Sequence, residues 1–268
     1  MDSLGIIAGN RALPLIFATE ARKHGVKKLV AVAFEDETDP ALAGLVDEIV
    51  WLRVGQLGKM IRAFTERGIQ QCVMVGQIAP KNLFDLRLDM RAMALFLRLK
   101  EKNAHTIFGA IVDELKKDGV VVVEATPWLR DLMPGPGHVA GPKLDKDQQA
   151  DVEFGLRIAR EISRLDIGQT VVVKNGVVLA VEAHEGTDEC IRRGGFLAGP
   201  DGGAVAVKVA KAGHDMRFDI PCIGPATIQS CDSARVGVLA FEAGKTLLLE
   251  KQKLLEVAGH SRISLAGV

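Results

Sequence analysis

The sequence carries no net charge, and this absence bears first on its partners. Its 268 residues include 34 lysines and arginines against 34 aspartates and glutamates, so the formal charge at pH 7 is zero. Proteins that bind nucleic acid through the phosphate backbone carry a basic surplus. We therefore expect no nucleic-acid partner bound by whole-molecule attraction, and only a local basic patch stays open.

Cysteine is scarce and long apolar runs are lacking. No apolar run approaches the roughly 20 residues of a membrane-spanning helix. The first residues differ from a signal peptide, because Asp2 stands in place of a basic region and Arg11 interrupts the apolar run. We expect a reduced, cytoplasmic protein. None of the four cysteines forms a CxxC pair or a zinc-type spacing; they are Cys72, Cys190, Cys222 and Cys231.

Common catalytic signatures are missing as well. There is no HExxH, no GxSxG and none of the paired metal motifs of calcineurin-like phosphoesterases. The segment 244–246, Gly-Lys-Thr, resembles the end of a P-loop, but the first glycine of that motif would fall on Leu239. The segment 8–12 follows an apolar run without completing GxGxxG, which gives a Rossmann-like oxidoreductase only weak support.

Apolar runs and helical patterns alternate through the first half of the chain. Strands alternating with helices indicate a parallel sheet covered on both faces, and so a Rossmann-like N-terminal domain over residues 1–132. The predicted strands are 4–8, 29–33, 49–54, 72–75 and 120–123, and the predicted helices are 14–24, 57–66 and 106–117.

A segment dense in proline and glycine, 133–142, cannot continue a helix or a central strand and is predicted to be a linker. Asp145 then caps a helix with an apolar stripe. Two β-branched runs around Asn175-Gly176 predict a hairpin, and Thr187 is expected to cap the next helix. With strands at 205–209, 236–241 and 246–249 and a helix at 250–257, these elements predict a mixed-sheet α/β domain over 143–268. The fold class is thus α/β with two domains.

Ligands in open α/β sheets bind beyond the carboxyl ends of the strands, which selects four loops. One contains Gly9 and Asn10, and another contains Gly76 and Gln77. A third joins the hairpin to a helix whose free N–H groups suit a phosphate. The fourth runs from 208 to 224. The third loop comprises Glu185, Gly186, Thr187 and Asp188.

The fourth loop combines cations and carboxylates in little space. Lys208, Lys211 and Arg217 could hold phosphate oxygens, while Asp215 and Asp219 could hold a divalent cation or orient a water. Diphosphate hydrolysis needs both kinds of group. The plainer interpretation is a polar loop with surface ion pairs.

Asp219 stands out in this loop, because apolar residues flank it on both sides. A carboxylate in an apolar frame needs a metal or a base as its partner, and the alternative is a buried ion pair. His184 and His214 are acid/base candidates, and Glu182 is a second candidate carboxylate. The segment 83–99 is either a core helix with solvated arginines or a surface for acyl chains or a membrane.

Four segments of the chain resemble the LpxI family, the UDP-2,3-diacylglucosamine pyrophosphatases of lipid A biosynthesis. The combination of the DIGQ and EGTD motifs is the specific part of this resemblance. The segments are 6–14 (IIAGNRALP), 165–169 (LDIGQ), 179–188 (LAVEAHEGTD) and 217–224 (RFDIPCIG).

The resemblance implies a two-domain hydrolase that holds a lipid nucleotide between its domains. It implies cleavage of UDP-2,3-diacylglucosamine to UMP and 2,3-diacylglucosamine 1-phosphate, with Mg²⁺ (or Mn²⁺) as cofactor. The family's essential aspartate falls on Asp219, which would be both catalytic and metal-binding. Gly9, Asn10, Gln169 and the 185–188 loop fall on ligand motifs. The chain departs from its relatives at 102–106, which lacks an acidic pair found there.

These observations together predict a magnesium-dependent hydrolase at the cytoplasmic face of the inner membrane. Its partners would be the acylated UDP-glucosamine lipid and the membrane surface, to which it would bind peripherally, and a homodimer is left open. The alternatives are a regulatory protein that binds a nucleotide or lipid without catalysis, or a Rossmann-like oxidoreductase. Besides Gly9, Asn10, Gln169 and the 185–188 loop, the residues predicted to bind the substrate are Gly76, Gln77, Lys208, Lys211 and Arg217.

Overall fold

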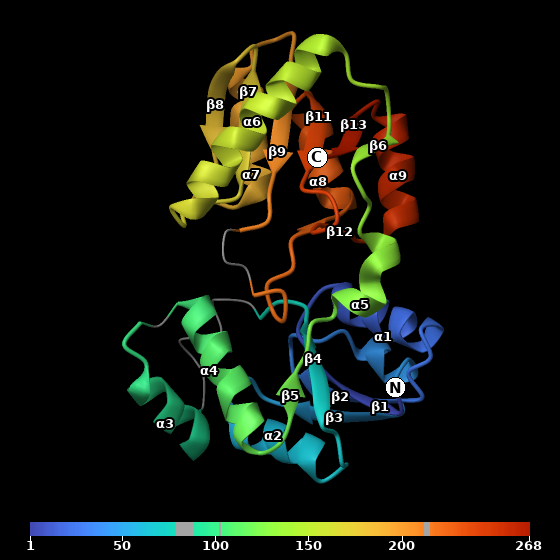
Figure 1. Ribbon diagram of the computed structural model, residues 1–268, viewed down its shortest axis with the longest axis vertical. Coiled ribbons are helices and arrows are strands. Elements are labelled where there is room, and N and C mark those ends of the chain that lie inside the picture. The colour runs from blue at the N-terminus through green and yellow to red at the C-terminus, as the bar shows by residue number, and fades with distance from the viewer. Residues whose placement is uncertain (79–87, 102, 212–214) are drawn as a thin grey trace. The chain divides into compact units, whose positions relative to one another are not determined.

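The computed structural model describes residues 1–78, 88–101, 103–211 and 215–268, and the chain forms two compact units (Figure 1). The first unit contains Met1–Leu129 together with Met216–Phe218, and the second contains Arg130–Asp215 and Asp219–Val268. The short segment Met216–Phe218 belongs to the first unit because Phe218 packs there, with its ring centroid 5.7 Å from that of Phe108.

A five-stranded parallel sheet forms the centre of the first unit, as the alternating pattern predicted. The strand order is β3-β2-β1-β4-β5, so the chain moves outward in one direction from β1 to β3 and in the other from β4 to β5. This is the Rossmann-like order, with its switch point between β1 and β4. The strands are β1 (Ser3–Ala8), β2 (Lys28–Phe34), β3 (Glu48–Leu52), β4 (Gln71–Val75) and β5 (Val121–Val122).

Helices cover both faces of this sheet, and so its strands are almost wholly apolar. On one face Phe17 of α1 makes an edge-to-face contact with Trp128 of α5. On the other, Phe64 of α2 and Leu115 of α4 enter one core with Val30 and Cys72. The elements are α1 (Leu13–Lys23), the 3-10 helix η1 (Pro40–Gly44), α2 (Leu57–Thr65), α3 (Met90–Arg98), α4 (Ala104–Lys117) and α5 (Thr126–Leu129).

The second unit has a six-stranded mixed sheet in the order β6-β13-β11-β9-β7-β8, which confirms the predicted class. Strands β13, β11 and β9 are parallel, while β6 and the hairpin of β7 and β8 are antiparallel additions at the two edges. The strands are β6 (Gly137–Ala140), β7 (Thr170–Lys174), β8 (Val177–Val181), β9 (Ala204–Lys208), β11 (Val236–Phe241) and β13 (Ser264–Gly267); β10 (Cys222–Ile223) and β12 (Leu247–Leu248) pair separately.

The segment 133–142, predicted as a linker, contributes β6 to this sheet. A segment rich in proline and glycine can form this strand because it lies at the edge of the sheet, where a strand makes backbone hydrogen bonds to a neighbour on one side only. Strand β13, which pairs with it, was not predicted. Its four residues give too short a pattern to distinguish a strand from a tail.

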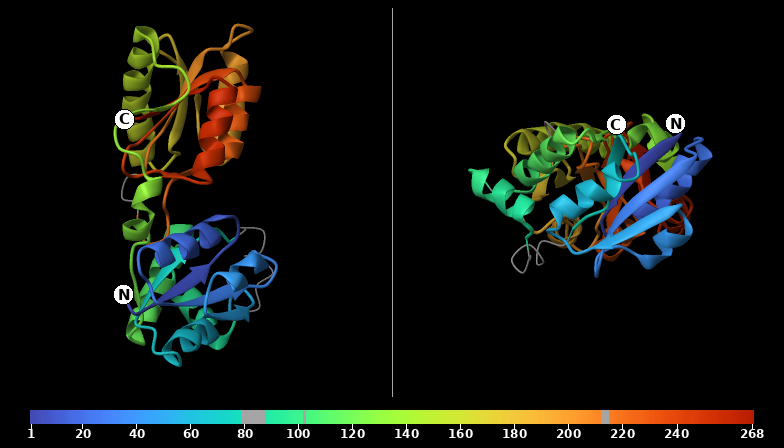
Figure 2. Two further views of the ribbon diagram at one scale, coloured as in Figure 1. Left: turned by 90° about the vertical axis from the view of Figure 1, so that its right-hand side faces the viewer. Right: turned by 90° about the horizontal axis from the view of Figure 1, so that it is seen from below.

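Helix α6 lies on one face of the second sheet, and α7, α8 and α9 cover the other (Figure 2). Asp145 caps α6 as predicted, and Gln148 completes a capping box. The elements are η3 (Arg130–Leu132), α6 (Lys146–Arg164), α7 (Thr187–Leu197), α8 (Pro225–Ser233) and α9 (Lys251–His260). In the part of the chain that the structure describes, no helix is both long and apolar enough to cross a membrane.

The β7–β8 hairpin turns at Asn175 and Gly176, as predicted, with φ angles of 51° and 72°. Both backbone N–H groups of the turn donate to the carboxylate of Asp151 on α6, at 2.8 Å and 2.7 Å. Asp151 is only 5% exposed, so this carboxylate connects the helix to the hairpin in a largely dehydrated place. The turn is thereby held by a contact distant in sequence.

Replacing this carboxylate is expected to weaken the second unit. Asp151→Ala removes two hydrogen bonds to the backbone of the turn, each worth about 0.5–1.5 kcal/mol of unfolding free energy. Chemical denaturation measures the loss. The matched control is Glu153→Ala on the exposed side of α6, which should change stability by less than about 0.5 kcal/mol. Equal effects of the two substitutions would show that the turn does not depend on Asp151.

Candidate functional sites

The first candidate site lies at the switch point of the first sheet, where the chain leaves β1 and β4. The sequence-predicted residues Gly9, Asn10, Gly76 and Gln77 meet there. The N–H of Gly9 donates to the carbonyl of Val75 at 2.8 Å, and the N–H of Asn10 donates to the carbonyl of Gln77 at 2.7 Å. The two loops therefore extend the β1–β4 pairing past the ends of the strands.

Glycine is required at two positions of this junction. A Cβ on Gly9 would lie 2.5 Å from the carbonyl oxygen of Gln77, and one on Gly76 would lie 2.7 Å from that of Asn10. Gly76 also has a φ of +91°, which side chains other than glycine rarely adopt. The two backbones can therefore approach each other, and a ligand, only because both positions lack a side chain.

Asn10 supplies the polar side chain of this site. Its Nδ2 donates to the carboxylate of Glu37 at 2.6 Å, while its Oδ1 is buried and accepts no hydrogen bond from the described residues. Buried polar atoms are nearly always satisfied, so this oxygen is an acceptor available to a ligand. Sequence reasoning missed Glu37, although its place just after the second strand of a Rossmann-like order was a usable signal.

The second candidate site lies at one edge of the second sheet. Strand β7 runs antiparallel to β8 and β9. The start of β7 and the C-terminal ends of β8 and β9 therefore lie on the same side of the sheet. This geometry gathers five polar side chains from segments that are separate in sequence. They are Gln169, Glu182, Thr187, Asp188 and Lys208, of which all but Glu182 were predicted to bind substrate.

Lys208 is the central side chain of this cluster. It is only 7% exposed, and its ammonium donates to the hydroxyl of Thr187 at 3.2 Å and to the carbonyl of Cys222 at 3.1 Å. Burial lowers the pKa of Lys208 below its ordinary value. The carboxylate of Glu182 opposes that shift, and Asp188 and Asp219 add to the opposition. Lys208 is therefore a dehydrated cation held among acceptors.

Glu182 is the buried carboxylate of the cluster, with 6% exposure. It accepts a hydrogen bond from the Thr187 hydroxyl at 3.1 Å and one from the backbone N–H of Gln169 at 3.3 Å. It was predicted only as a second candidate carboxylate. Because Thr187 donates to Glu182, a lone pair of the same hydroxyl is left to accept from Lys208.

The predicted capping role of Thr187 is wrong. Gly186, with a φ of +86°, is the N-cap of α7, and Thr187 is the first residue of the helix. Its hydroxyl is engaged by Glu182 and Lys208 instead of by the first turn. Nearby, Asp188 Oδ1 and Gln169 Oε1 are buried and have no hydrogen-bond partner among the described residues.

The other predicted residues have surroundings of their own. Lys211 forms an ion pair with Asp166, and Arg217 is a half-buried residue of the first unit. Asp219 is exposed, so the expected apolar frame is wrong, although its charge is felt at Lys208. The neighbouring Phe218 packs into the first unit and Pro221 is buried, and neither encloses the carboxylate. His184 is exposed, and His214 falls outside the described residues.

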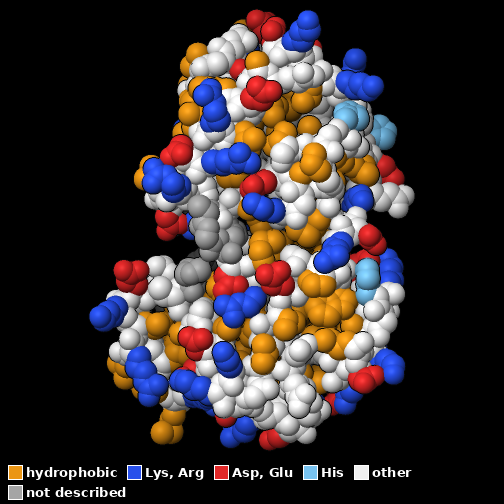
Figure 3. Space-filling model, viewed as in Figure 1, with side chains coloured by type: hydrophobic (Ala, Val, Ile, Leu, Met, Phe, Trp, Pro, Cys, Tyr) orange, Lys and Arg blue, Asp and Glu red, His pale blue; other side chains and the backbone are white. Residues whose placement is uncertain are grey.

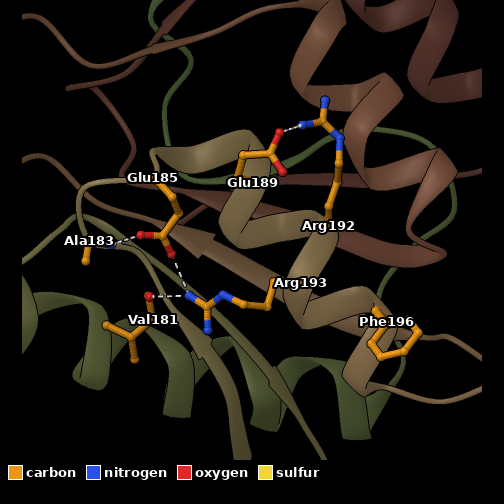
Figure 4. A pocket seen from close by; sticks show the side chains of 7 residues that line it. All are labelled: Val181, Ala183, Glu185, Glu189, Arg192, Arg193 and Phe196. Carbon is orange, nitrogen blue, oxygen red and sulfur yellow. Dashed lines mark hydrogen bonds and ion pairs between the residues drawn. The ribbon is translucent and has the colours of Figure 1, made fainter.

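Glu185 belongs to a separate surface pocket (Figure 4). Its carboxylate accepts from Arg193 at 2.5 Å and from the N–H of Ala183 at 3.0 Å, and the Arg193 hydrogen bond lowers the pKa of Glu185. Arg192 likewise pairs with Glu189. Both arginines of the pocket are thus neutralised by neighbouring acids. The lining residues are Val181, Ala183, Glu185, Glu189, Arg192, Arg193 and Phe196.

A ready-made metal centre is not found within the described ranges, where no three or more His, Cys, Asp or Glu side chains gather to hold an ion. Three carboxylates have charges that act on Lys208, and they are those of Glu182, Asp188 and Asp219. Magnesium usually takes only one or two protein carboxylates and completes its shell with water and substrate phosphates. The donors present therefore fit a magnesium ion that is bound together with a phosphorylated substrate.

The fold and the two strand-edge sites define a two-unit α/β protein with a Rossmann-like first unit and a buried lysine at the sheet edge of the second. Profiles of the LpxI N-terminal domain and the LpxI C-terminal domain match residues 3–132 and 135–266. The chain belongs to the LpxI family.

Individual relatives agree with this assignment. A protein of Caulobacter vibrioides named UDP-2,3-diacylglucosamine pyrophosphatase LpxI is 29% identical over 277 residues, which cover 100% of this chain and 98% of that protein.

Two solved structures show only distant similarity. N5-carboxyaminoimidazole ribonucleotide synthetase from Thermotoga maritima is 17% identical, with a TM-score of 0.26, over 69% of this chain and 42% of that one. The biotin carboxylase domain of the Hydrogenobacter thermophilus 2-oxoglutarate carboxylase is 12% identical, with a TM-score of 0.28, over 74% and 41%. This chain thus spans less than half of either protein, and scores this low carry no argument.

The glycine requirement at the switch point is testable. Gly9→Ala forces the β1 and β4 loops apart, and overpacking of this kind costs about 1–3 kcal/mol of stability. Thermal unfolding measures it. Gly44→Ala is the control, because its added Cβ meets open space and should leave the unfolding midpoint nearly unchanged. A stable Gly9→Ala variant would mean that the two loops can separate freely.

Proposed function

We propose that this chain hydrolyses the diphosphate of UDP-2,3-diacylglucosamine to UMP and 2,3-diacylglucosamine 1-phosphate. Membership of the LpxI family and the name of the Caulobacter relative supply the reaction. The observation that carries the proposal is the buried Lys208 beside the first turn of α7, where a cation and unpaired helix N–H groups are suited to a phosphate. The regulatory and oxidoreductase alternatives have no comparable feature in their favour.

Lys208 would neutralise charge on the diphosphate. A cation that is already dehydrated attracts an anion more strongly than a solvated one, and it needs little reorganisation as charge builds up on the phosphoryl oxygens. Glu182 would act through Lys208 and not on the substrate itself, since its negative charge favours the protonated form of the lysine. Glu182 also orients the Thr187 hydroxyl toward that ammonium.

Asp219 would orient the attacking water and, with Asp188, hold Mg²⁺ or Mn²⁺ against the substrate phosphates. Asp188 Oδ1 has no hydrogen-bond partner among the described residues, and the charge of Asp219 acts on Lys208, which supports placing both carboxylates at the phosphate site. When bound, the ion would neutralise phosphate charge and polarise the phosphorus–oxygen bonds. The first-unit junction of Gly9, Asn10, Gly76 and Gln77 would bind substrate through backbone groups and the free Asn10 oxygen. Gln169, Lys211, Arg217 and the 185–188 loop remain proposed contacts.

The substrate's acyl chains would keep the enzyme at the cytoplasmic face of the inner membrane as a peripheral protein. The direct test is release of UMP from UDP-2,3-diacylglucosamine with and without a chelator. UMP released only in the presence of Mg²⁺ or Mn²⁺ supports the whole proposal, and release unaffected by chelator removes the metal from it. Tight binding without UMP release would favour the regulatory alternative.

Asp219→Ala should lower kcat by at least about 100-fold while substrate binding persists, because it removes a group needed for the chemical step. Single-turnover UMP release and equilibrium binding separate the two effects. Asp201→Ala, an exposed aspartate in a turn of the same unit, is the matched control and should keep wild-type turnover. Near-normal turnover of Asp219→Ala would remove Asp219 from the mechanism.

Glu182→Gln should shift the pH dependence of kcat/KM. Glu182 raises the pKa of Lys208 against the effect of burial, so its neutralisation lets the lysine lose its proton at lower pH. The alkaline limb of the profile then moves to lower pH. Glu189→Gln on the exposed face of α7 is the control. A uniform drop in activity with an unmoved limb would mean that Glu182 is merely structural.

A further inference from the structure

Helix α3 is apolar on both of its sides. Ala92 and Leu95 are buried in the core of the first unit, and Phe96 packs against it. On the opposite side Met90, Met93 and Leu97 are 89%, 52% and 81% exposed. Their spacing of three and four residues places the three side chains on one face, with the exposed Ala94 between them. We call Met90, Met93 and Leu97 the outer face of α3.

Polar contacts hold α3 in an orientation that leaves its outer face exposed. The carboxylate of Asp89 accepts from the N–H of Ala92 at 2.9 Å as an N-cap, and from the N–H of Gly58 on α2 at 2.7 Å. Arg91 donates to Glu114 of α4 at 3.0 Å and pairs with Asp118 at 2.5 Å. The helix is therefore held against α2 and α4 in one orientation. Rotating the outer face inward would break these contacts and expose Leu95.

The flank of the outer face is basic. Arg98 in the last turn and Lys100 just beyond it are exposed, and neither pairs with an acid of the described chain. Among the described residues, the acid that adjoins them in sequence is Glu101, whose side chain accepts a hydrogen bond from Asn103. At the position of α3, Figure 3 shows hydrophobic side chains at the surface with Lys and Arg side chains beside them.

We propose that the outer face of α3 enters the interfacial layer of an anionic lipid bilayer, with Arg98 and Lys100 against the head groups. An apolar helix face flanked by cations is the pattern of proteins that lie on such a surface. A second copy of this chain is a poorer occupant, because a two-fold contact would bring the same basic flank of both copies together. The inference deepens the proposed function, which places the substrate in a membrane, and it names the surface that reaches it.

Vesicle co-sedimentation tests the proposal. Wild-type protein should bind vesicles of phosphatidylethanolamine with phosphatidylglycerol more tightly than vesicles of phosphatidylcholine alone. The double variant Met93→Asp/Leu97→Asp should lose about tenfold or more in affinity for both, because two side chains can no longer be buried. Arg98→Gln/Lys100→Gln, which leaves the apolar face intact, should lose affinity chiefly for the anionic vesicles.

The matched control is Phe196→Asp/Leu197→Asp, which makes the same change at another exposed apolar pair, on α7. It should bind vesicles like the wild type, and circular dichroism confirms folding of every variant. Unchanged binding of both α3 variants overturns the proposal. So does a change of oligomeric state in lipid-free solution, which would identify a second copy as the occupant.

UMP release separates this inference from the proposed function. The α3 variants should keep wild-type activity on substrate dispersed in detergent and lose it on substrate embedded in vesicles. A wild-type protein that binds vesicles but releases no UMP would refute the proposed function and leave the membrane surface standing. Equal loss of activity in detergent and in vesicles would indicate damage to the first unit and overturn the role of the outer face.

Discussion

The buried ammonium of Lys208 is the constraint around which the second unit is arranged. Dehydrating a lysine is costly unless acceptors and negative charge surround it. Here those partners come from separate segments: Thr187 from the start of α7, Glu182 from the end of β8, and the carbonyl of Cys222 from β10. The antiparallel placement of β7 and β8 beside β9 is what brings these segments to one edge. Packing and chemistry thus depend on the same strand order.

The candidate site of the first unit is built from backbone groups instead of a buried cation. Among the described residues its switch point has no buried cation, and two glycines let the β1 and β4 loops approach within hydrogen-bond distance. Beside the Glu37 carboxylate, the junction presents backbone groups and the unsatisfied amide oxygen of Asn10. The two candidate sites therefore differ in chemistry.

Local signals in the sequence predicted much of the fold. The parallel sheet follows from apolar runs alternating with helices, and the hairpin follows from Asn175-Gly176, a pair that favours the positive φ angles of a tight turn. The predictions failed where a residue's conformation or contacts depend on partners that are distant in sequence. The Thr187 hydroxyl prefers Glu182 and Lys208 to its own helix, and β13 is a strand only because β11 and β6 lie beside it. Apolar neighbours in sequence likewise did not bury Asp219, and one of them, Phe218, packs in the core of the first unit.

A carboxylate inside the proposed phosphate site is at first sight contradictory, since Glu182 would repel the anion that Lys208 would attract. The hydrogen-bond directions resolve the contradiction. The Thr187 hydroxyl has one proton and gives it to Glu182, so toward Lys208 it can only accept. Thr187 is therefore no donor to a phosphate, which leaves Lys208 and the first N–H groups of α7 for that purpose. Without Glu182, burial would favour the neutral lysine, whose amine nitrogen could then accept the proton of the Thr187 hydroxyl. In the proposed site, Glu182 would weaken the attraction for the anion, but it favours the charged form of Lys208.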